Sequence, residues 1–425
     1  MALHLLRDRP VRRFTATTFA EAIGDQMARS LAPIIAVGLL DAGTATVGLL
    51  HSLSLAMFLL LSIPLGALGD RLSRPVAMMT VSTALRMAAT GCGVLAWALG
   101  GLEDAGGIGT LLGIMLVVGI ADVVFTTGRS VLVPRLVPSA QIRPMMGAVH
   151  TAAQIGTVLG PLALTGLLAL ASAPLSWLGV MLAYLISLVA QRGLRAHDLP
   201  PAGNVSAPAA ARPGPLRRGI THLLAEPTLR RITASSALHN ASAMAANTLL
   251  PVIALTELGI SPATFAGLGA LGAVTGVAGA ASASRLTARL GLHRVRIAAA
   301  LCTGAGVALV VLATLDADVL PGHPVCWIGA FSAISGFCTS VSAVAGSDLL
   351  ARLAPREMLG GVSGAQRTVT MGVMPVSALL IGLLGALLGT LAASIVWLVL
   401  ALSAALPCLR LLDPEDEPGP CPART

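Results

Sequence analysis

Five ionisable residues inside apolar stretches carry most of the chemistry that this sequence offers. Glu21, Asp25 and Arg29 follow one another at intervals of four residues, which places their side chains on one face of a helix. Arg86 and Asp122 lie within two later apolar stretches. A charge inside a membrane span costs about 2.5 to 3.5 kcal/mol on insertion scales, so such residues are candidates for a functional site.

The five residues comprise three carboxylates and two guanidinium groups, which leaves one acid without a fixed cationic partner. Burial without a partner disfavours the charged form of a carboxylate, so its affinity for a proton changes when the surrounding cavity opens to water. A proton-coupled carrier requires this property. We predict Asp25 as the proton or cation site, with Glu21 and Asp122 supporting it. Arg29 is predicted to hold together the charged face formed with Glu21 and Asp25. The alternative is that the five groups only neutralise one another as a structural network.

Uncharged polar residues occur in other apolar stretches. The seventh stretch holds a cluster of His239, Asn240 and Asn247, the second holds His51, and the fifth holds His150 and Gln154. We predict that the cluster of the seventh stretch, together with the five charged residues, lines a cavity for protons and substrate.

Composition defines the class of protein. The 425 residues are 55% hydrophobic and 11% charged, with a mean hydropathy of +0.86, which is typical of a polytopic membrane protein and excludes a nucleic-acid partner. The 27 basic residues are all arginines, so a lysine-dependent phosphate loop is excluded. Six scattered cysteines without C-x-x-C spacing predict no metal site. We therefore expect no cofactor and a proton gradient as the energy source.

The hydropathy pattern predicts an all-α membrane protein with twelve transmembrane helices, since a span needs about 20 apolar residues. The stretches lie near residues 15–40, 45–68, 76–99, 107–128, 146–170, 174–191, 232–256, 263–284, 295–315, 325–347, 364–388 and 390–410. The loops between them are alternately rich in arginine and free of it. By the positive-inside bias, both termini and the loop around Asp70 are predicted to be cytoplasmic.

A break near the middle predicts two domains. Residues 199–215 are rich in Pro, Gly and Ala, as in a flexible linker. We predict an N-terminal six-helix bundle over 1–191, a cytoplasmic linker over 192–231, a C-terminal six-helix bundle over 232–411 and a cytoplasmic tail over 412–425. Within the linker, Leu216, Ile220, Leu223 and Leu224 have helical spacing, which indicates an amphipathic helix. It lies either on the inner leaflet or against the bundle.

The two halves repeat each other. The segment Leu132–Pro138 matches Leu349–Pro355 at an offset of 217 residues, and Gly147-Ala148 matches Gly364-Ala365 at the same offset. Arg71-Leu72-Ser73 matches Arg289-Leu290-Gly291 at an offset of 218. The repeat predicts two bundles related by a pseudo-two-fold axis along the membrane normal.

A polar, glycine-rich segment, Gly66–Arg74, separates the second and third stretches and is expected to form a tight turn. With Gly66, Gly69, Asp70, Arg71 and Arg74 it resembles the loop motif G-x-L-x-D-R-x-G-R-[RK] of the major facilitator superfamily. Ser73 replaces a glycine of that motif and Pro75 replaces a base.

The resemblance implies a mechanism for this loop and a cavity between the bundles. In the family the loop acid meets the inner end of helix 11, near residues 364–367 here, and an arginine of helix 4, here Arg129. The loop would then be a cytoplasmic gate; the alternative is a topology determinant without a switching role. Helices 1, 4, 7 and 10 line the family's cavity, whereas helix 3 is peripheral, so Arg86 would only pair with an acid of helix 1.

Further residues are similar to the branch that contains macrolide-efflux and enterobactin-exporter-like proteins. They are Gly24-Asp25, Gly128-Arg129-Ser130, Leu249-Leu250-Pro251 and Ala365-Gln366-Arg367. Gly147, Gly156, Gly160 and Pro161 have the spacing of the antiporter motif that drug exporters carry in helix 5. Close packing of small residues is the alternative explanation for that spacing.

Together these features predict a proton-coupled exporter, an antiporter of a small amphiphilic molecule such as a drug, antibiotic or siderophore. We expect a monomer in the inner or plasma membrane whose partners are the lipid bilayer, protons and the small-molecule substrate. A lipid or lysolipid flippase, a proton-coupled importer and a binding-only sensor stay open as alternatives. An enzyme is not expected: Gly361–Gly364 matches the G-x-S-G of intramembrane serine proteases, but no histidine follows His323 to act as the base.

Overall fold

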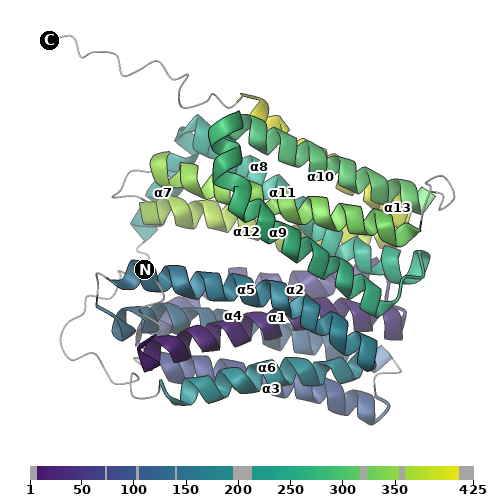
Figure 1. The fold of residues 1–425 in the computed structure, drawn as a ribbon, viewed down its shortest axis with the longest axis horizontal. Helices are drawn as coiled ribbons and strands as arrows, with labels where there is room; N and C mark the ends of the chain where they lie inside the picture. The colour runs from purple at the N-terminus through teal and green to yellow at the C-terminus, as the bar shows by residue number, and fades with distance from the viewer. Residues whose placement is uncertain are drawn as a thin grey trace. The chain divides into compact units, whose positions relative to one another are not determined.

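The structure is a computed structural model that describes residues 7–71, 74–101, 105–138, 141–194, 213–315, 323–353 and 359–410. These residues are almost entirely helical (Figure 1). The predicted linker and tail fall largely on residues 195–212 and 411–425, which lie outside the described ranges.

The first half of the chain forms six long helices and one short 3-10 helix. They are α1 (Arg9–Leu40), α2 (Thr44–Arg71), α3 (Pro75–Ala98), α4 (Ala105–Leu136), α5 (Ile142–Leu170), η3 (Pro174–Ser176) and α6 (Trp177–Arg192). Prolines begin α3 and lie near the start of α1, where the missing N–H costs nothing.

The second half repeats this plan after one extra helix. Its elements are α7 (Pro213–Ala225), α8 (Pro227–Val252), η5 (Ile253–Glu257), α9 (Pro262–Leu290), α10 (Leu292–Leu315), α11 (Pro324–Leu353), α12 (Leu359–Leu388), α13 (Thr390–Ser403) and η6 (Leu406–Arg410). The π-turn η5 follows Pro251 within α8, where proline cannot supply its helical hydrogen bond.

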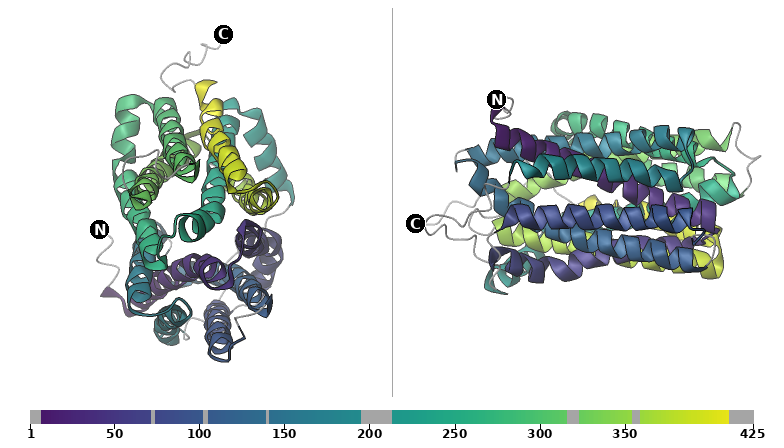
Figure 2. Two further views of the ribbon diagram at one scale, coloured as in Figure 1. Left: turned by 90° about the vertical axis from the view of Figure 1, so that its right-hand side faces the viewer. Right: turned by 90° about the horizontal axis from the view of Figure 1, so that it is seen from below.

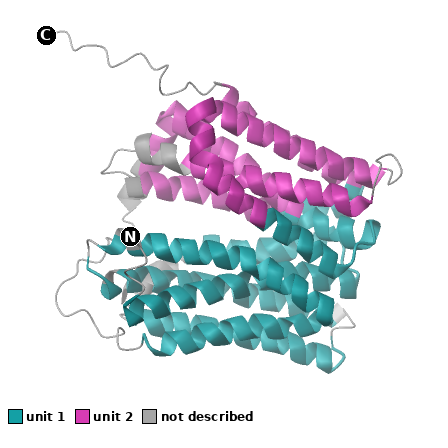
Figure 3. Cartoon of the chain, in the orientation of Figure 1, with its two compact units in different colours: residues 1–210, 247–273, 378–390 teal, residues 211–246, 274–377, 391–425 magenta. Residues whose placement is uncertain are grey.

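The chain divides into two compact units (Figure 3). Unit 1 comprises Met1–Ala210, Asn247–Ala273 and Ala378–Thr390, and unit 2 comprises Ala211–Ala246, Val274–Ser377 and Leu391–Thr425. Each unit therefore follows one half of the chain closely, except that unit 1 also takes two segments from the second half.

In unit 1, α1 packs on α5 and α6, while α3 packs on α4 and α6 (Figures 1 and 2). The apolar centre of this unit includes Leu31, Trp177 and Tyr184, whose side chains are fully buried. The packing places α1 between helices that come from later in the chain, so its charged face is enclosed by the bundle.

The second-half segments of unit 1 attach to α2 at a seam of glycines. The Thr44 hydroxyl donates to the Gly382 carbonyl oxygen over 2.9 Å. A Cβ atom added at Gly48 would lie 2.4 Å from the Ala378 carbonyl oxygen, and one added at Gly382 would lie 3.0 Å from the Gly48 Cα. Only glycine allows α2 and α12 to approach this closely.

Ten helices that the structure describes are long and apolar enough to cross a membrane, which makes this a multi-pass membrane protein. The sequence predicts twelve spans, and the two that do not reach this hydropathy are α3 and α8. Their lengths of 24 and 26 residues suffice for a span. They fall short because they carry polar side chains, including Arg86 on α3 and His239 on α8.

Two predicted boundaries are wrong. The expected tight turn at Gly66–Arg74 is largely helical, because α2 continues to Arg71 and α3 begins at Pro75. The fourth stretch was expected to end near residue 128, but α4 continues to Leu136. In both cases the helical hydrogen bonds extend beyond the apolar segment, which hydropathy alone does not detect.

The amphipathic segment of the linker forms α7. A Cβ atom on Gly219 would lie 2.3 Å from backbone atoms of Gly361, so α7 packs tightly on the start of α12. Leu223 is buried, whereas Ile220 and Leu224 are exposed. One face thus packs on the bundle and the other presents apolar side chains.

Candidate functional site

The charged face of α1 meets Arg86, which projects from α3 into the centre of unit 1. Arg86 Nη1 lies 2.8 Å from Glu21 Oε2 and 2.5 Å from Asp25 Oδ1, so one nitrogen serves both acids. The Arg86 side chain is fully buried, and its guanidinium lies 5.2 Å from the ring centre of Phe125 and 5.9 Å from that of Tyr184. The aromatic faces add a favourable cation–π interaction in this dry environment.

Glu21 is held by both of its oxygens. Its Oε1 accepts hydrogen bonds from the Thr83 hydroxyl over 2.5 Å and from the Ser187 hydroxyl over 2.7 Å, while Oε2 binds Arg86. Gln191 in turn donates to both of those hydroxyls. Glu21 is 2% exposed, so its carboxylate is sealed and fully hydrogen-bonded, as a buried ion must be.

Asp25 is held by one oxygen alone. Its Oδ1 accepts hydrogen bonds from Arg86 and from the Tyr184 hydroxyl, the latter over 2.9 Å. Within the described part of the chain, no group donates to Oδ2. The Asp25 side chain is 19% exposed, in contrast to the sealed carboxylate of Glu21.

A second ion pair joins α1 to α4. Arg29 Nη2 lies 3.2 Å from Asp122 Oδ2, and the two side chains are 39% and 25% exposed. Arg86 Nη2 is 3.8 Å from Asp122 Oδ1, which links this pair to the buried pairs. Arg29 thus extends toward α4, and the cation that contacts Glu21 and Asp25 is Arg86.

We name these five residues, Glu21, Asp25, Arg29, Arg86 and Asp122, the ionic cluster. Three carboxylates face two guanidinium groups, so the cluster carries one formal negative charge in excess when all acids are ionised. The structure brings together all five charged residues that the sequence singles out, and it places Arg86 at their centre.

The α6 residues of this site were missed. Tyr184, Ser187 and Gln191 recur at intervals of three and four residues, which is the helical spacing of a shared face, and Tyr184 is the only tyrosine of the chain. That spacing was available from the sequence. Gly24 accommodates the Tyr184 ring, since a Cβ atom there would lie 2.8 Å from ring atom Cε1.

The residues of the predicted His-Asn cluster make separate contacts. His239 Nε2 lies 2.9 Å from the Thr339 hydroxyl of α11, and Asn240 donates to the Thr370 carbonyl oxygen of α12. Asn247 belongs to unit 1 instead. The side chains of His239 and Asn240 therefore reach different neighbours.

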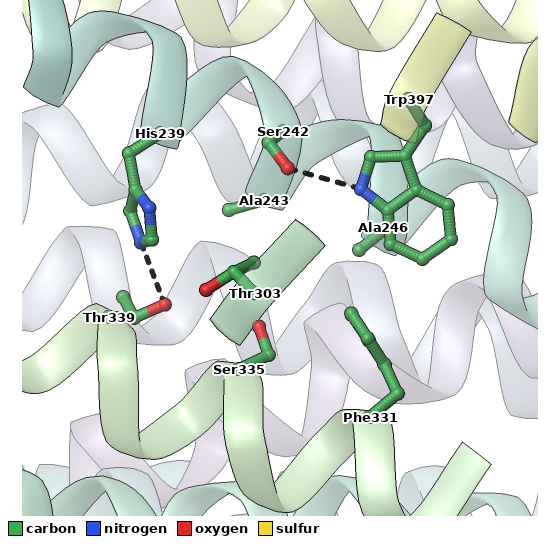
Figure 4. Close-up of a pocket in the computed structure, with 9 residues that line it drawn as sticks. All are labelled: His239, Ser242, Ala243, Ala246, Thr303, Phe331, Ser335, Thr339 and Trp397. Carbon is green, nitrogen blue, oxygen red and sulfur yellow. Dashed lines mark hydrogen bonds between the residues drawn. The ribbon is translucent and has the colours of Figure 1, made fainter. Parts of the chain in front are cut away.

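His239 lines a small pocket inside unit 2, between α8, α10, α11 and α13 (Figure 4). Trp397 Nε1 donates to the Ser242 hydroxyl over 3.2 Å at one side of the pocket, and Thr303, Ser335 and Thr339 add further hydroxyls. The Trp397 ring also packs edge-on against Phe331.

A buried arginine of unit 2 was also missed. Arg296 of α10 is 3% exposed and donates to the Ser235 and Ser236 hydroxyls and to the Ser342 carbonyl oxygen. It lies near the start of α10 and is not among the charged residues that the sequence singles out.

The predicted gate is described in part. Gly66, Gly69, Asp70 and Arg71 lie in the last turns of α2, but their side chains are not among those that the structure describes. The contact predicted between Asp70 and Arg129 therefore stays a prediction. Arg74 is exposed at the start of α3.

The antiporter-like glycines of α5 differ in their surroundings. Cβ atoms on Gly156 and Gly160 would lie 2.7 Å from Ala22 Cβ and 2.9 Å from Gln26 Cβ on α1, whereas one on Gly147 would meet nothing within 4 Å. Gly156 and Gly160 thus bring α5 onto α1 beside the ionic cluster, and Pro161 follows within the same helix. Gly147 makes no comparable approach.

Comparison with known proteins now identifies the family. The family model of the Major Facilitator Superfamily matches residues 14–321 and 232–424. The chain belongs to the major facilitator superfamily. It is a membrane transporter of that superfamily and not an enzyme. No curated protein matches it.

Solved structures of other transporters share the fold. The nucleoside transporter NupG is 12% identical, with 94% of this chain and 97% of that chain covered at a TM-score of 0.71. A POT family transporter in complex with 5-aminolevulinic acid is 14% identical, with 94% and 95% covered at 0.72. A bacterial homologue of the iron transporter ferroportin is 17% identical, with 93% and 98% covered at 0.65. These identities are low enough that the likeness extends to the fold alone.

Proposed function

We propose that this superfamily member is a proton-coupled exporter, an antiporter that moves a small amphiphilic molecule by alternating access. The excess acid of the ionic cluster supports this proposal most directly. Arg86 holds two carboxylates with one nitrogen, so loss of one negative charge leaves a balanced cluster. Protonation of one acid removes the excess negative charge, so a site of this kind can bind a proton without leaving a buried cation or acid unpaired.

We assign the proton to Asp25, at Oδ2. Glu21 already accepts three hydrogen bonds over its two oxygens, and it is sealed from solvent. Asp25 has the unoccupied oxygen and the more accessible side chain. A proton on Oδ2 leaves Oδ1 free to keep its bond from Tyr184, while Arg86 stays paired with Glu21.

The proposed topology has twelve spans in two six-helix bundles, with α3 and α8 as the two spans of lower hydropathy. Both termini are cytoplasmic and the protein is a monomer in the inner or plasma membrane. The arginine-rich loops support this orientation through the positive-inside bias. The bundles are residues 1–191 and 232–411, joined by the linker 192–231 and followed by the tail 412–425. No cofactor is needed, because the proton gradient supplies the energy.

Export is favoured by the α5 glycines and Pro161, whose spacing resembles the antiporter motif. The resemblance to the macrolide-efflux and enterobactin-exporter-like branch supports a drug, an antibiotic or a siderophore as the substrate. The two half-buried acids of the cluster, Asp25 and Asp122, suit the positively charged end of such a molecule.

Two measurements test the proposal. Infrared difference spectra of the reconstituted full chain across a pH titration should show the carbonyl stretch of a protonated carboxylic acid, and Asp25→Asn should abolish it. In proteoliposomes with an imposed pH gradient, ethidium and other amphiphilic cations should accumulate against their own gradient with the parent protein and not with Asp25→Asn.

Asp41→Asn is the matched control. Asp41 is exposed at the end of α1 in a left-handed conformation that asparagine also adopts, so its exchange removes an acid of the same helix without strain. The proposal fails if Asp25→Asn proteoliposomes still accumulate the cations as the parent and Asp41→Asn proteins do.

A further inference from the structure

The pocket of unit 2 occupies the position that the ionic cluster occupies in unit 1. Matching the buried positions of the repeated helices places His239 at the position of Glu21, Ser242 at that of Gly24 and Ala243 at that of Asp25. In the same way Thr303 corresponds to Arg86 and Thr339 to Asp122. Trp397 corresponds to Ser187, one turn beyond Tyr184 on α6.

Smaller side chains explain why a cavity exists there. An alanine and a threonine stand where the first bundle has an aspartate and an arginine. The volume of this cavity is about 10 Å³, close to the minimum that one water molecule needs. Since the lining contains no carboxylate and no guanidinium, the occupant is uncharged.

The hydroxyls of the lining leave hydrogen-bonding capacity unused. Thr303 donates to the Ala299 carbonyl oxygen and Thr339 is paired with His239. Ser242 accepts from Trp397 but donates to no described residue, and Ser335 has no described partner. Ser242 is buried and Ser335 is half-buried. A water molecule with two to four polar neighbours would use the remaining hydrogen-bonding capacity of both hydroxyls.

We propose that this pocket binds one water molecule between Ser242 and Ser335, as the uncharged counterpart of the ionic cluster, and that proton binding is confined to the first bundle. Among the lining residues His239 is the ionisable side chain of the imidazole type, and its Nε2 is already paired with the Thr339 hydroxyl. Arg296 of α10 is buried in the same unit, so a proton on His239 would place a second positive charge inside unit 2. This division of roles rests on the proposed proton coupling, whereas the water site does not.

A structure of the full chain at a resolution that shows buried water tests the site itself. In a buffer without polyols we expect one peak within hydrogen-bonding distance of both serine hydroxyls, and no xenon at this position after pressurisation, because only dry apolar cavities take up xenon. A xenon peak there overturns the proposal, as does an empty pocket when other buried waters of the same bundle are resolved.

Removal of one hydroxyl gives an independent test. If water satisfies Ser335, Ser335→Ala should lower the midpoint of thermal unfolding by about 1–3 °C relative to Ser332→Ala. Ser332 lies one turn earlier on α11 and outside the pocket lining, so the matched exchange corrects for helix propensity. A rise for Ser335→Ala indicates a dry pocket and contradicts the proposal.

His239→Gln tests the division of roles. The number of protons bound across the pH titration should equal that of the parent, whereas Asp25→Asn should bind one fewer. If His239→Gln loses a proton while Asp25→Asn still loses one, the proposed function survives and the confinement to the first bundle is wrong. If Asp25→Asn loses none, the proposed function itself fails.

Discussion

The two helical bundles of this transporter place different chemistry on the same framework. In unit 1 an arginine on the third helix joins acids of the first, and in unit 2 a threonine and an alanine stand at the matching points. An aromatic residue of the last helix donates to the first helix in both: Tyr184 to Asp25, and Trp397 to Ser242. The same packing of helices therefore accommodates charged side chains in unit 1 and hydroxyl side chains in unit 2. The chemistry of each bundle depends on a few side chains.

The largest difference between the bundles should appear when the central side chain of each is made apolar. Arg86→Leu leaves Glu21 buried without its cation and should cost about 4 kcal/mol of stability, because breaking a buried ion pair leaves an uncompensated charge. Thr303→Val, at the matching point of unit 2, should cost about 1 kcal/mol. Thermal unfolding of both variants in the same detergent measures the contrast. Equal losses of stability would show that the ionic cluster stabilises the fold no more than the matching residues of unit 2 do.

Moving the ion pair into unit 2 tests whether the framework is interchangeable. Ala243→Asp alone should destabilise by about 3 kcal/mol, since it buries an acid without a partner. Adding Thr303→Arg should restore at least half of that loss, because the guanidinium reaches the new carboxylate as Arg86 reaches Asp25. A double-mutant cycle measures the coupling, and additive losses would mean that the two frameworks are not equivalent.

The aromatic donors differ in the charge of their acceptors. Tyr184→Phe removes a hydrogen bond to a carboxylate and should cost about 2 kcal/mol, whereas Ser242→Ala removes a neutral acceptor from Trp397 and should cost about 1 kcal/mol. Unfolding midpoints rank the two. Tyr184→Phe should also alter the carboxylic-acid infrared band, which Ser242→Ala leaves unchanged.

The smallest effect is expected at Gly24. Its alanine variant brings a methyl group to 2.8 Å from the Tyr184 ring and should cost about 1 kcal/mol, through displacement of that ring from Asp25. The matched exchange Gly147→Ala, at a glycine with open surroundings, should be neutral or slightly stabilising. If both variants unfold at the parent midpoint, the Tyr184 position is not constrained by α1.

Much of this architecture follows from local sequence patterns. The features that could not be predicted depend on contacts between helices that are distant in the sequence. Apolar runs predict the helices well, and spacing along α1 correctly predicts a shared charged face. The central role of Arg86 could not be read in this way, because it depends on which helices enclose α1. The α6 residues carried a spacing signal, but the acceptors of Tyr184 and Ser187 lie some 160 residues away on α1. Polar side chains also lower the hydropathy of α3, so function itself weakens the signal for a span.

The glycine seam between α2 and α12 has a consequence for genetics. Gly48 and Gly382 touch through backbone atoms, although more than 300 residues separate them in the chain. A substitution at Gly48 is thus expected to find its suppressors among residues 378–385, far away in the coding sequence. Defects at Gly382 should in turn resemble defects of the first half of the chain. The two halves of the chain repeat one arrangement of helices, but this packing makes the effect of a substitution in one half depend on residues of the other.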